Sequence, residues 1–127
     1  MAAIPASEAP PTSVVRLSLV VIRVAELERA RRFYEEIGLQ FAVERHGNGP
    51  EHLACRLDGL VFEIYPAEKA STMAGIVIGF RVPSLAKVLE SLRMNGADVI
   101  SNPCQTPWGL RAVVRDPDGH RVELTEG

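Results

Sequence analysis

Apolar and polar positions repeat with two different periods along the chain, which predicts a mixture of strands and helices. The β-branched run VVRLSLVVIRV at residues 14–24 is typical of a strand. In the next segment, 25–38, apolar residues recur every three or four positions, which predicts a helix that ends at Gly38. The first half therefore reads strand, helix, strand, strand, strand, with the last three strands expected at 39–45, 51–57 and 60–66.

After a polar connector, PAEKASTMA at residues 66–74, the same order begins again. A strand is predicted at 75–82, and Ser84 is a natural N-cap for a helix at 85–95 that Gly96 ends. The segment SNPCQTPWG at 101–109 is rich in turn residues and is expected to be a loop. The remaining strands are predicted at 97–100, 110–115 and 120–125.

Matching positions in the two halves lie at a nearly constant separation. Gly38 and Gly96 are 58 residues apart, and Glu63 and Glu123, each four residues after the glycine of a turn, are 60 apart. Self-similarity at a fixed period is the mark of repeated structural units. The sequence therefore predicts an internal duplication.

The Asp58-Gly59 pair predicts a hairpin that places Leu57 opposite Leu60. Neighbouring side chains of a strand point to opposite faces of a sheet. Leu53, Cys55, Phe62 and their alternate neighbours should meet the helix, and Cys55 then acts as a small buried hydrophobe. Glu123 shares its face with Arg121 and Thr125 by the same alternation. The face away from the helix carries His52, Ala54, Arg56, Val61, Glu63 and Tyr65.

Composition narrows the classes of function. A chain of 127 residues with a net charge of −2 and no basic block has neither two domains nor the footprint of a nucleic-acid binder. No signal peptide or membrane-spanning apolar run is found, and two isolated cysteines fit a cytoplasmic, reducing location. The prediction is a disordered tail at 1–14 and one domain at 15–127, with modules at 15–66 and 75–126 joined by a connector at 67–74.

The duplicated pattern, with VIRVAELERARRFYEEIGLQF and WGLRAVVRDPDGHRVELTE, resembles the vicinal oxygen chelate superfamily over residues 15–126. This superfamily includes glyoxalase I, bleomycin-resistance proteins and extradiol dioxygenases. The resemblance implies an α+β fold in which two tandem βαβββ modules form an incomplete barrel around a cup. It also implies a homodimer, in which each subunit often supplies one module to a cup.

The resemblance maps the two Glu ligands of glyoxalase-like metal sites onto Glu63 and Glu123. The other two ligands, His or Gln on the first strand of each module, map onto Leu19 and Val77, which offer no donor atom for a metal. A degenerate metal site follows, and no strongly bound cofactor is expected. A divalent metal held by Glu63, Glu123 and His52 stays open as an alternative.

The leading interpretation is a protein that holds a small organic molecule in the cup, with Glu63 and Glu123 as candidate catalytic groups. One alternative is a metal-dependent lyase, isomerase or dioxygenase that uses these glutamates with His52 or waters. Another is an accessory domain with a vestigial cup. Ion pairs of the glutamates with Arg56 and Arg121 would give them a purely structural role, and His120 is expected at a solvated edge. The predicted ligand-binding residues are Leu19, Val21, His52, Arg56, Tyr65, Val77, Trp108 and Arg111.

Overall fold

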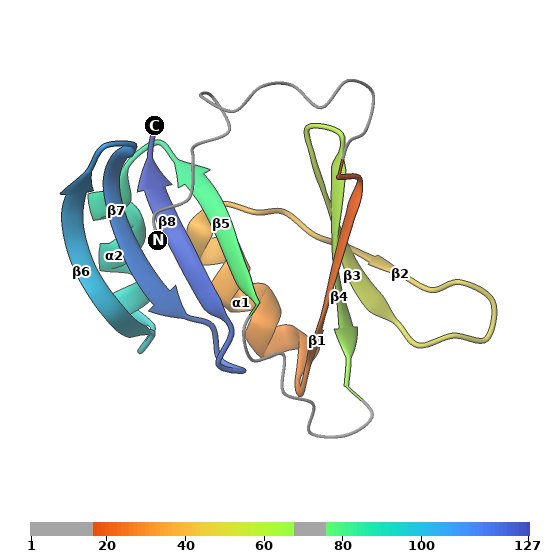
Figure 1. Ribbon diagram of the computed structural model, residues 1–127. Helices are drawn as coiled ribbons and strands as arrows, with labels where there is room; N and C mark the ends of the chain where they lie inside the picture. Colours follow the sequence, from red (N-terminus) through yellow and green to blue (C-terminus); the bar gives the residue numbers. More distant parts are fainter. Residues whose placement is uncertain (1–16, 68–75) are drawn as a thin grey trace.

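The computed structural model describes residues 17–67 and 76–127, which form two successive βαβββ modules (Figure 1). No helix in this part of the chain is long and apolar enough to cross a membrane. The predicted tail at 1–14 and most of the connector lie outside the described residues. The elements are β1 (Leu19–Val24), α1 (Leu27–Ile37), β2 (Ala42–Glu44), β3 (His52–Leu57), β4 (Leu60–Pro66), β5 (Val77–Val82), α2 (Leu85–Met94), β6 (Asp98–Thr106), β7 (Gly109–Arg115) and β8 (Arg121–Glu126).

Each module forms its own four-stranded sheet with the same strand order. Sheet A has the order β1-β4-β3-β2, and sheet B has the order β5-β8-β7-β6. The first strand of each module runs parallel to the last, and the other pairs are antiparallel. The predicted α+β class and tandem modules are confirmed. Both sheets are open, with β1 and β5 as outer strands.

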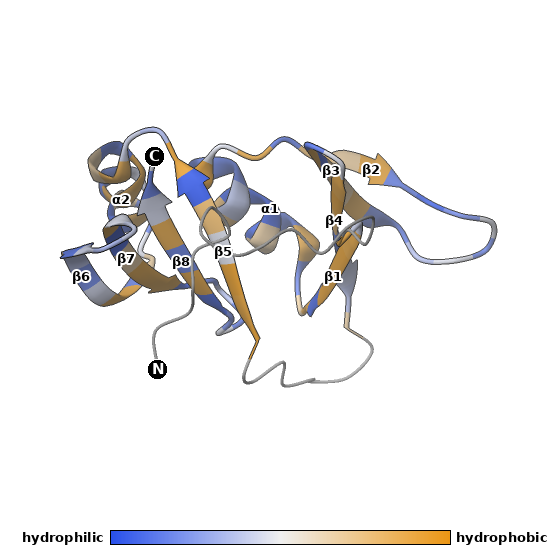
Figure 2. Cartoon of the chain, turned by 45° about the horizontal axis from the view of Figure 1, so that its top comes forward, coloured by the Kyte–Doolittle hydropathy of each residue, from blue (hydrophilic) through white to orange (hydrophobic). Residues whose placement is uncertain are grey.

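One apolar core runs through both modules. The buried faces of the helices, Ala30, Phe33, Tyr34 and Ile37 in α1 and Leu85, Leu89 and Leu92 in α2, have the predicted spacing. The ring of Tyr34 lies 5.3 Å from Phe62 in sheet A and 6.1 Å from Phe80 in sheet B, between centroids. Both sheets therefore turn their apolar faces toward this shared core, as the hydropathy in Figure 2 illustrates, and their other faces outward.

The hairpin between β3 and β4 has the predicted register. Leu57 lies opposite Leu60 and Ala54 opposite Glu63. Asp58 and Gly59 have φ angles of 37° and 86°, and positive φ at both turn residues gives the twist that a two-residue hairpin favours. This turn therefore fixes which side chains of β3 and β4 face outward.

The loop predicted at 101–109 is wrong for most of its length. Strand β6 continues to Thr106, with register shifts between Val99 and Ser101 and between Ser101 and Cys104. Because β6 is an outer strand, Pro103 need not donate to a second neighbour, and bulges break the alternation of apolar and polar residues. The sequence signal of this strand is lost for both reasons.

A buried polar network joins the last turn of module two to α1 of module one. The Tyr34 hydroxyl donates to Oδ2 of Asp116 at 2.8 Å, and Nδ1 of His120 donates to the same oxygen at 2.6 Å. His120 is buried, which corrects the expectation of a solvated edge residue. The next acid, Asp118, accepts from the amide of Ala25 at 2.8 Å. These bonds fix the β7–β8 turn against the first module.

The network shifts the pKa values of its members. Burial alone would raise the pKa of the Asp116 carboxyl, but the hydrogen bonds from His120 and Tyr34 outweigh burial and lower it. The hydrogen bond to Asp116 raises the pKa of His120, against the opposing effect of burial. Burial, followed by the charge of Asp116, raises the pKa of Tyr34 well above its usual value, so the phenol stays protonated.

His120→Gln should therefore lose stability in a pH-dependent way. A raised pKa in the folded state adds stability that is complete below the unfolded pKa of about 6.5 and is lost as pH rises through the folded pKa. The free energy of unfolding, from urea titrations between pH 5.5 and 9, should favour the wild type by about 1–2 kcal/mol at the acid end and converge toward the variant at the alkaline end. Tyr34→Phe is the control, with a loss that stays nearly constant. A constant loss for His120→Gln would contradict the charged pair.

Candidate functional site

The outer face of sheet A carries the residues predicted for the cup. Glu63 on β4 lies between Ala54 of β3 and Val21 of β1, and Val61 lies between Arg56 and Leu19. The same face is extended at its other end by a ladder of polar and aromatic side chains. This ladder contains Arg23, Tyr65, His52 and Glu44.

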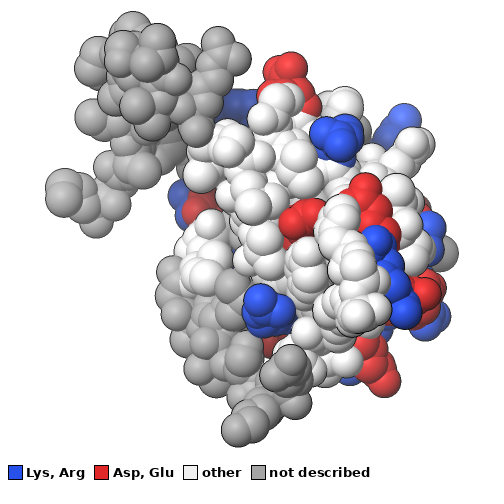
Figure 3. All heavy atoms as spheres, turned by 90° about the vertical axis from the view of Figure 1, so that its right-hand side faces the viewer, with Lys and Arg blue, Asp and Glu red and all other residues white. Residues whose placement is uncertain are grey.

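A hollow of about 810 Å³ opens over this face. Of the predicted site residues, Leu19, Arg56 and Glu63 line it. Acidic and basic side chains are interspersed on the side of the molecule seen in Figure 3, which carries β2 and β3. The hollow therefore offers apolar walls with a few polar groups, the general form of a small-molecule site. Its lining residues are Ser18, Leu19, Gln40, Phe41, Ala42, Glu44, His46, Ala54, Arg56, Val61 and Glu63.

A second hollow, of about 630 Å³, lies between the helices and the β7–β8 turn. Its polar lining includes Arg29, Arg32, Glu36 and Asp116. The Asp116 carboxylate is already bonded to Tyr34 and His120 inside the fold. The hollow over sheet A, with its free outward-facing groups, is therefore the candidate site.

His52 is the most enclosed polar residue of the outer face, with 1% of its surface exposed. Its ring stacks on Tyr65 at 4.2 Å between centroids, as the predicted register requires. Nδ1 lies 3.3 Å from the carbonyl oxygen of Pro50. A carbonyl only accepts, so Nδ1 carries a proton and donates. Nε2 is buried and has no hydrogen-bond partner among the described residues.

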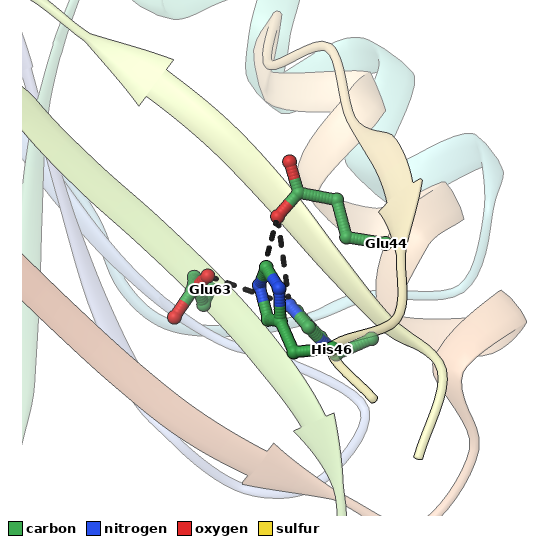
Figure 4. A group of neighbouring side chains, drawn as sticks. Glu44, His46 and Glu63 are labelled. Atoms are coloured by element: carbon green, nitrogen blue, oxygen red, sulfur yellow. Dashed lines mark ion pairs between the residues drawn. The ribbon is translucent and has the colours of Figure 1, made fainter. Parts of the chain in front are cut away.

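Two carboxylates and a second imidazole surround this unpartnered nitrogen (Figure 4). Nε2 of His52 lies 3.5 Å from Oε2 of Glu63 and 3.6 Å from Oε1 of Glu44. Nε2 of His46 lies 3.6 Å from the same oxygen of Glu44. We refer to Glu44, His46, His52 and Glu63 as the His52 cluster. Their ligand atoms all lie within 4.8 Å of one another.

Sequence reasoning missed Glu44 and His46 as site residues. Glu44 lies directly opposite His52 in the β2–β3 ladder, so the alternation of the second strand would have placed it on the outer face. His46 follows two residues later, beyond the end of β2, where no periodicity applies. Its position at the cluster depends on the path of the β2–β3 loop, which tertiary structure alone supplies.

Sheet B places its predicted site residues differently. Glu123 is held by Arg111, with Nε of Arg111 2.9 Å from Oε1 of Glu123. The unresolved register of this strand is now clear, because Arg111 lies opposite Thr125 and faces outward with Glu123. Val77 is exposed on the outer strand β5, and Trp108 is half-buried in the β6–β7 turn. The ion pair at Glu123 is thus made by Arg111, and the one at Glu63 by His52.

The four positions that correspond to the metal ligands of glyoxalase-like proteins do not fit a metal in this chain. Leu19 and Val77 have no donor atoms, and the carboxylate of Glu123 is paired with a guanidinium. Glu63 and Glu123 also lie on the outer faces of different sheets, which turn their apolar faces toward the common core. Within one chain, these glutamates therefore do not share a cavity.

Comparison with known proteins settles the family. The family model "Glyoxalase/Bleomycin resistance protein/Dioxygenase superfamily" matches residues 16–124, which is most of the chain. The chain belongs to this superfamily. Among curated relatives, the superfamily member is 26% identical to the uncharacterized protein YetH of Bacillus subtilis (strain 168) over 120 residues, which are 89% of this chain and 99% of YetH.

A second curated relative is the probable chloroplastic lactoylglutathione lyase of Arabidopsis thaliana. It is 30% identical over 129 residues, which cover 87% of this chain but only 35% of the plant protein. The chain therefore spans about a third of that relative.

Solved structures share the fold at low sequence identity. TnmS3, an antibiotic binding protein from Streptomyces sp. CB03234, has a TM-score of 0.71 at 21% identity, covering 91% of this chain and 98% of its own. A glyoxalase-related enzyme from Fulvimarina pelagi has a TM-score of 0.68 at 23% identity, covering 88% of both chains. At these identities the likeness shows the fold alone.

The Arg111–Glu123 pair should show measurable coupling, because each side chain is only about one-third exposed. A double-mutant cycle with Arg111→Ala and Glu123→Ala should give about 0.5–1 kcal/mol of interaction free energy in urea unfolding, smaller at 1 M salt. The matched control pairs Glu123→Ala with Arg121→Ala, its neighbour on the same face, and should give coupling within error. Equal coupling in both cycles would refute the specific pairing with Arg111.

Proposed function

We propose that the protein binds a small organic molecule in a cup that two copies of the chain build together. The observation that carries this proposal is the hollow on the outer face of sheet A, which has apolar walls and converging polar groups but lacks an opposite side within the chain. The outer face of sheet B from a second copy would supply that side. Each dimer would then contain two equivalent cups.

The exposed apolar side chains support this pairing. Leu19 is 50% exposed on β1 and Val77 is 46% exposed on β5, with Leu17 and Ile76 exposed beside them. These four are most of the large hydrophobic residues exposed in the described part of the chain. Both strands are also sheet edges with unpaired backbone groups, which favour pairing with another strand. Pairing β1 of one copy with β5 of the other covers both edges twice in a two-fold dimer.

The chemistry of the cup favours a planar, largely apolar ligand with a polar rim. Leu19, Phe41 and Val61 offer apolar contact, while Arg56 and Glu63 offer one positive and one negative group. In the dimer, the Arg111–Glu123 pair would add a second charged pair from the opposite wall. TnmS3, which has the same fold, is described as an antibiotic binding protein, and binding of this kind agrees with the proposal.

The Arabidopsis relative raises lyase activity as a second function. The usual metal ligands are replaced here by Leu19 and Val77, so the observed residues favour binding over glyoxalase chemistry. Metal-dependent isomerase or dioxygenase activity and a vestigial cup remain the other readings that the experiments below separate.

Disruption of the proposed sheet edges should make the protein monomeric. Leu19→Lys and Val77→Lys each place a charge on an edge strand, which opposes strand pairing. Sedimentation velocity should give a dimer for the wild type and a monomer for both variants. Met94→Lys, at an exposed apolar position on α2, is the matched control and should remain dimeric. A monomeric wild type would refute the two-copy cup.

Ligand binding should stabilise the wild type and disappear when the cup is filled. A thermal-shift panel of planar aromatic antibiotics, with S-substituted glutathiones as lyase-type probes, should contain antibiotics that raise the melting temperature in a concentration-dependent way. Val61→Trp, which fills the centre of the hollow, should abolish the shift, while Met94→Lys should retain it. Shifts by the glutathione probes alone would favour the lyase reading. The absence of any shift would favour a vestigial cup.

A further inference from the structure

We propose that the His52 cluster binds a divalent transition-metal ion of the zinc class within a single module. The four donors come from β2, the β2–β3 loop, β3 and β4 of one chain. Three of these residues, Glu44, His46 and His52, lie at positions other than those of the glyoxalase-type metal ligands. The site therefore needs neither a second copy nor a cup ligand, and it is independent of the proposed function.

The buried nitrogen of His52 is the strongest evidence for an ion. With Nδ1–H donating to the carbonyl of Pro50, the neutral ring presents a bare lone pair at Nε2. This lone pair faces acceptor oxygens of Glu44 and Glu63, and no hydrogen bond satisfies it. Burial of an unpaired acceptor beside carboxylates is costly. A cation between these atoms would remove both the unsatisfied lone pair and the repulsion.

The separations of the donor atoms fit a tetrahedral ion. Zinc binds His nitrogen and carboxylate oxygen at about 2.0–2.2 Å, so the ligand atoms of a regular tetrahedron lie roughly 3.3–3.6 Å apart. The distances of 3.5 Å from His52 to Glu63 and 3.6 Å from Glu44 to His52 and His46 match this spacing. They are too long for strong hydrogen bonds, which are about 2.7–3.2 Å.

The remaining surroundings also suit a metal. A metal-bound histidine usually donates its other N–H to a carbonyl or carboxylate, as Nδ1 of His52 does to Pro50. Stacking on Tyr65 holds the ring in place. Two imidazoles in the donor set favour zinc, nickel, cobalt or iron over magnesium and calcium. The His46 side chain is 73% exposed, so an ion can enter from the side of the β2–β3 loop.

The competing explanation is a metal-free ion pair in which His52 is protonated at both nitrogens and is shared by Glu44 and Glu63. This pair requires His52 and the glutamates but assigns no role to His46. A metal site requires His46 as a ligand. The effect of changing His46 therefore separates the two explanations.

The test is metal titration of the full-length chain after treatment with a chelator and dialysis. Competition against a chromophoric chelator should show one Zn²⁺ per chain, and Co²⁺ should give the intense visible absorption of a tetrahedral site. Glu44→Gln and His46→Gln should each weaken Zn²⁺ binding by about tenfold or more, since even outer-shell partners are worth about 10–100-fold. Both positions are at most partly buried, and circular dichroism would verify that the variants fold.

Glu123→Gln is the matched control, because Glu123 is the duplicate of Glu63 in module two and is paired with Arg111. It should bind Zn²⁺ like the wild type. The proposal is overturned if the wild type binds no Zn²⁺, if His46→Gln binds it unchanged, or if Glu123→Gln weakens binding as much as Glu63→Gln. The last result would place the ion between two modules instead of within one.

Discussion

The buried ring of Tyr34 touches Phe62 of sheet A and Phe80 of sheet B, and its hydroxyl is bonded to Asp116 in the last turn of module two. This contact joins the two halves of the chain into one core. Because each sheet must cover its apolar face, the core also decides that the polar faces point outward. The positions of all candidate site residues depend on this arrangement.

Outward-facing polar sheets explain why one chain cannot enclose a ligand by itself. Glu63 and Glu123 are duplicates in sequence, yet the shared core separates them onto different outer faces. The two modules have also diverged in chemistry. Glu123 is neutralised by Arg111, whereas Glu63 faces His52 and Glu44, where two carboxylates meet a buried imidazole. The ancestral symmetry is therefore kept by the fold and lost at the sites.

The duplication also accounts for the exposed edges. An outer strand with apolar side chains is an aggregation hazard unless it is covered. Here the hazard occurs at both β1 and β5, the equivalent strands of the two modules, so two copies related by a two-fold axis would cover both. The metal proposed in module one would tie the β2–β3 loop beside the open side of the hollow. Assembly and metal binding would thus act on opposite borders of the same surface.

The sequence by itself determined the order of the elements, the duplication, the β3–β4 register and the outward direction of His52, Glu63 and Tyr65, because turn chemistry and strand alternation are local. It missed strand β6, whose bulges erase the alternation, and the burial of His120, which depends on Tyr34 from the other module. Only tertiary structure decided that Glu63 and Glu123 are separated and that Glu44 and His46 reach His52. Those outcomes depend on how helices pack and how a loop returns, and neither leaves a periodic trace in the chain.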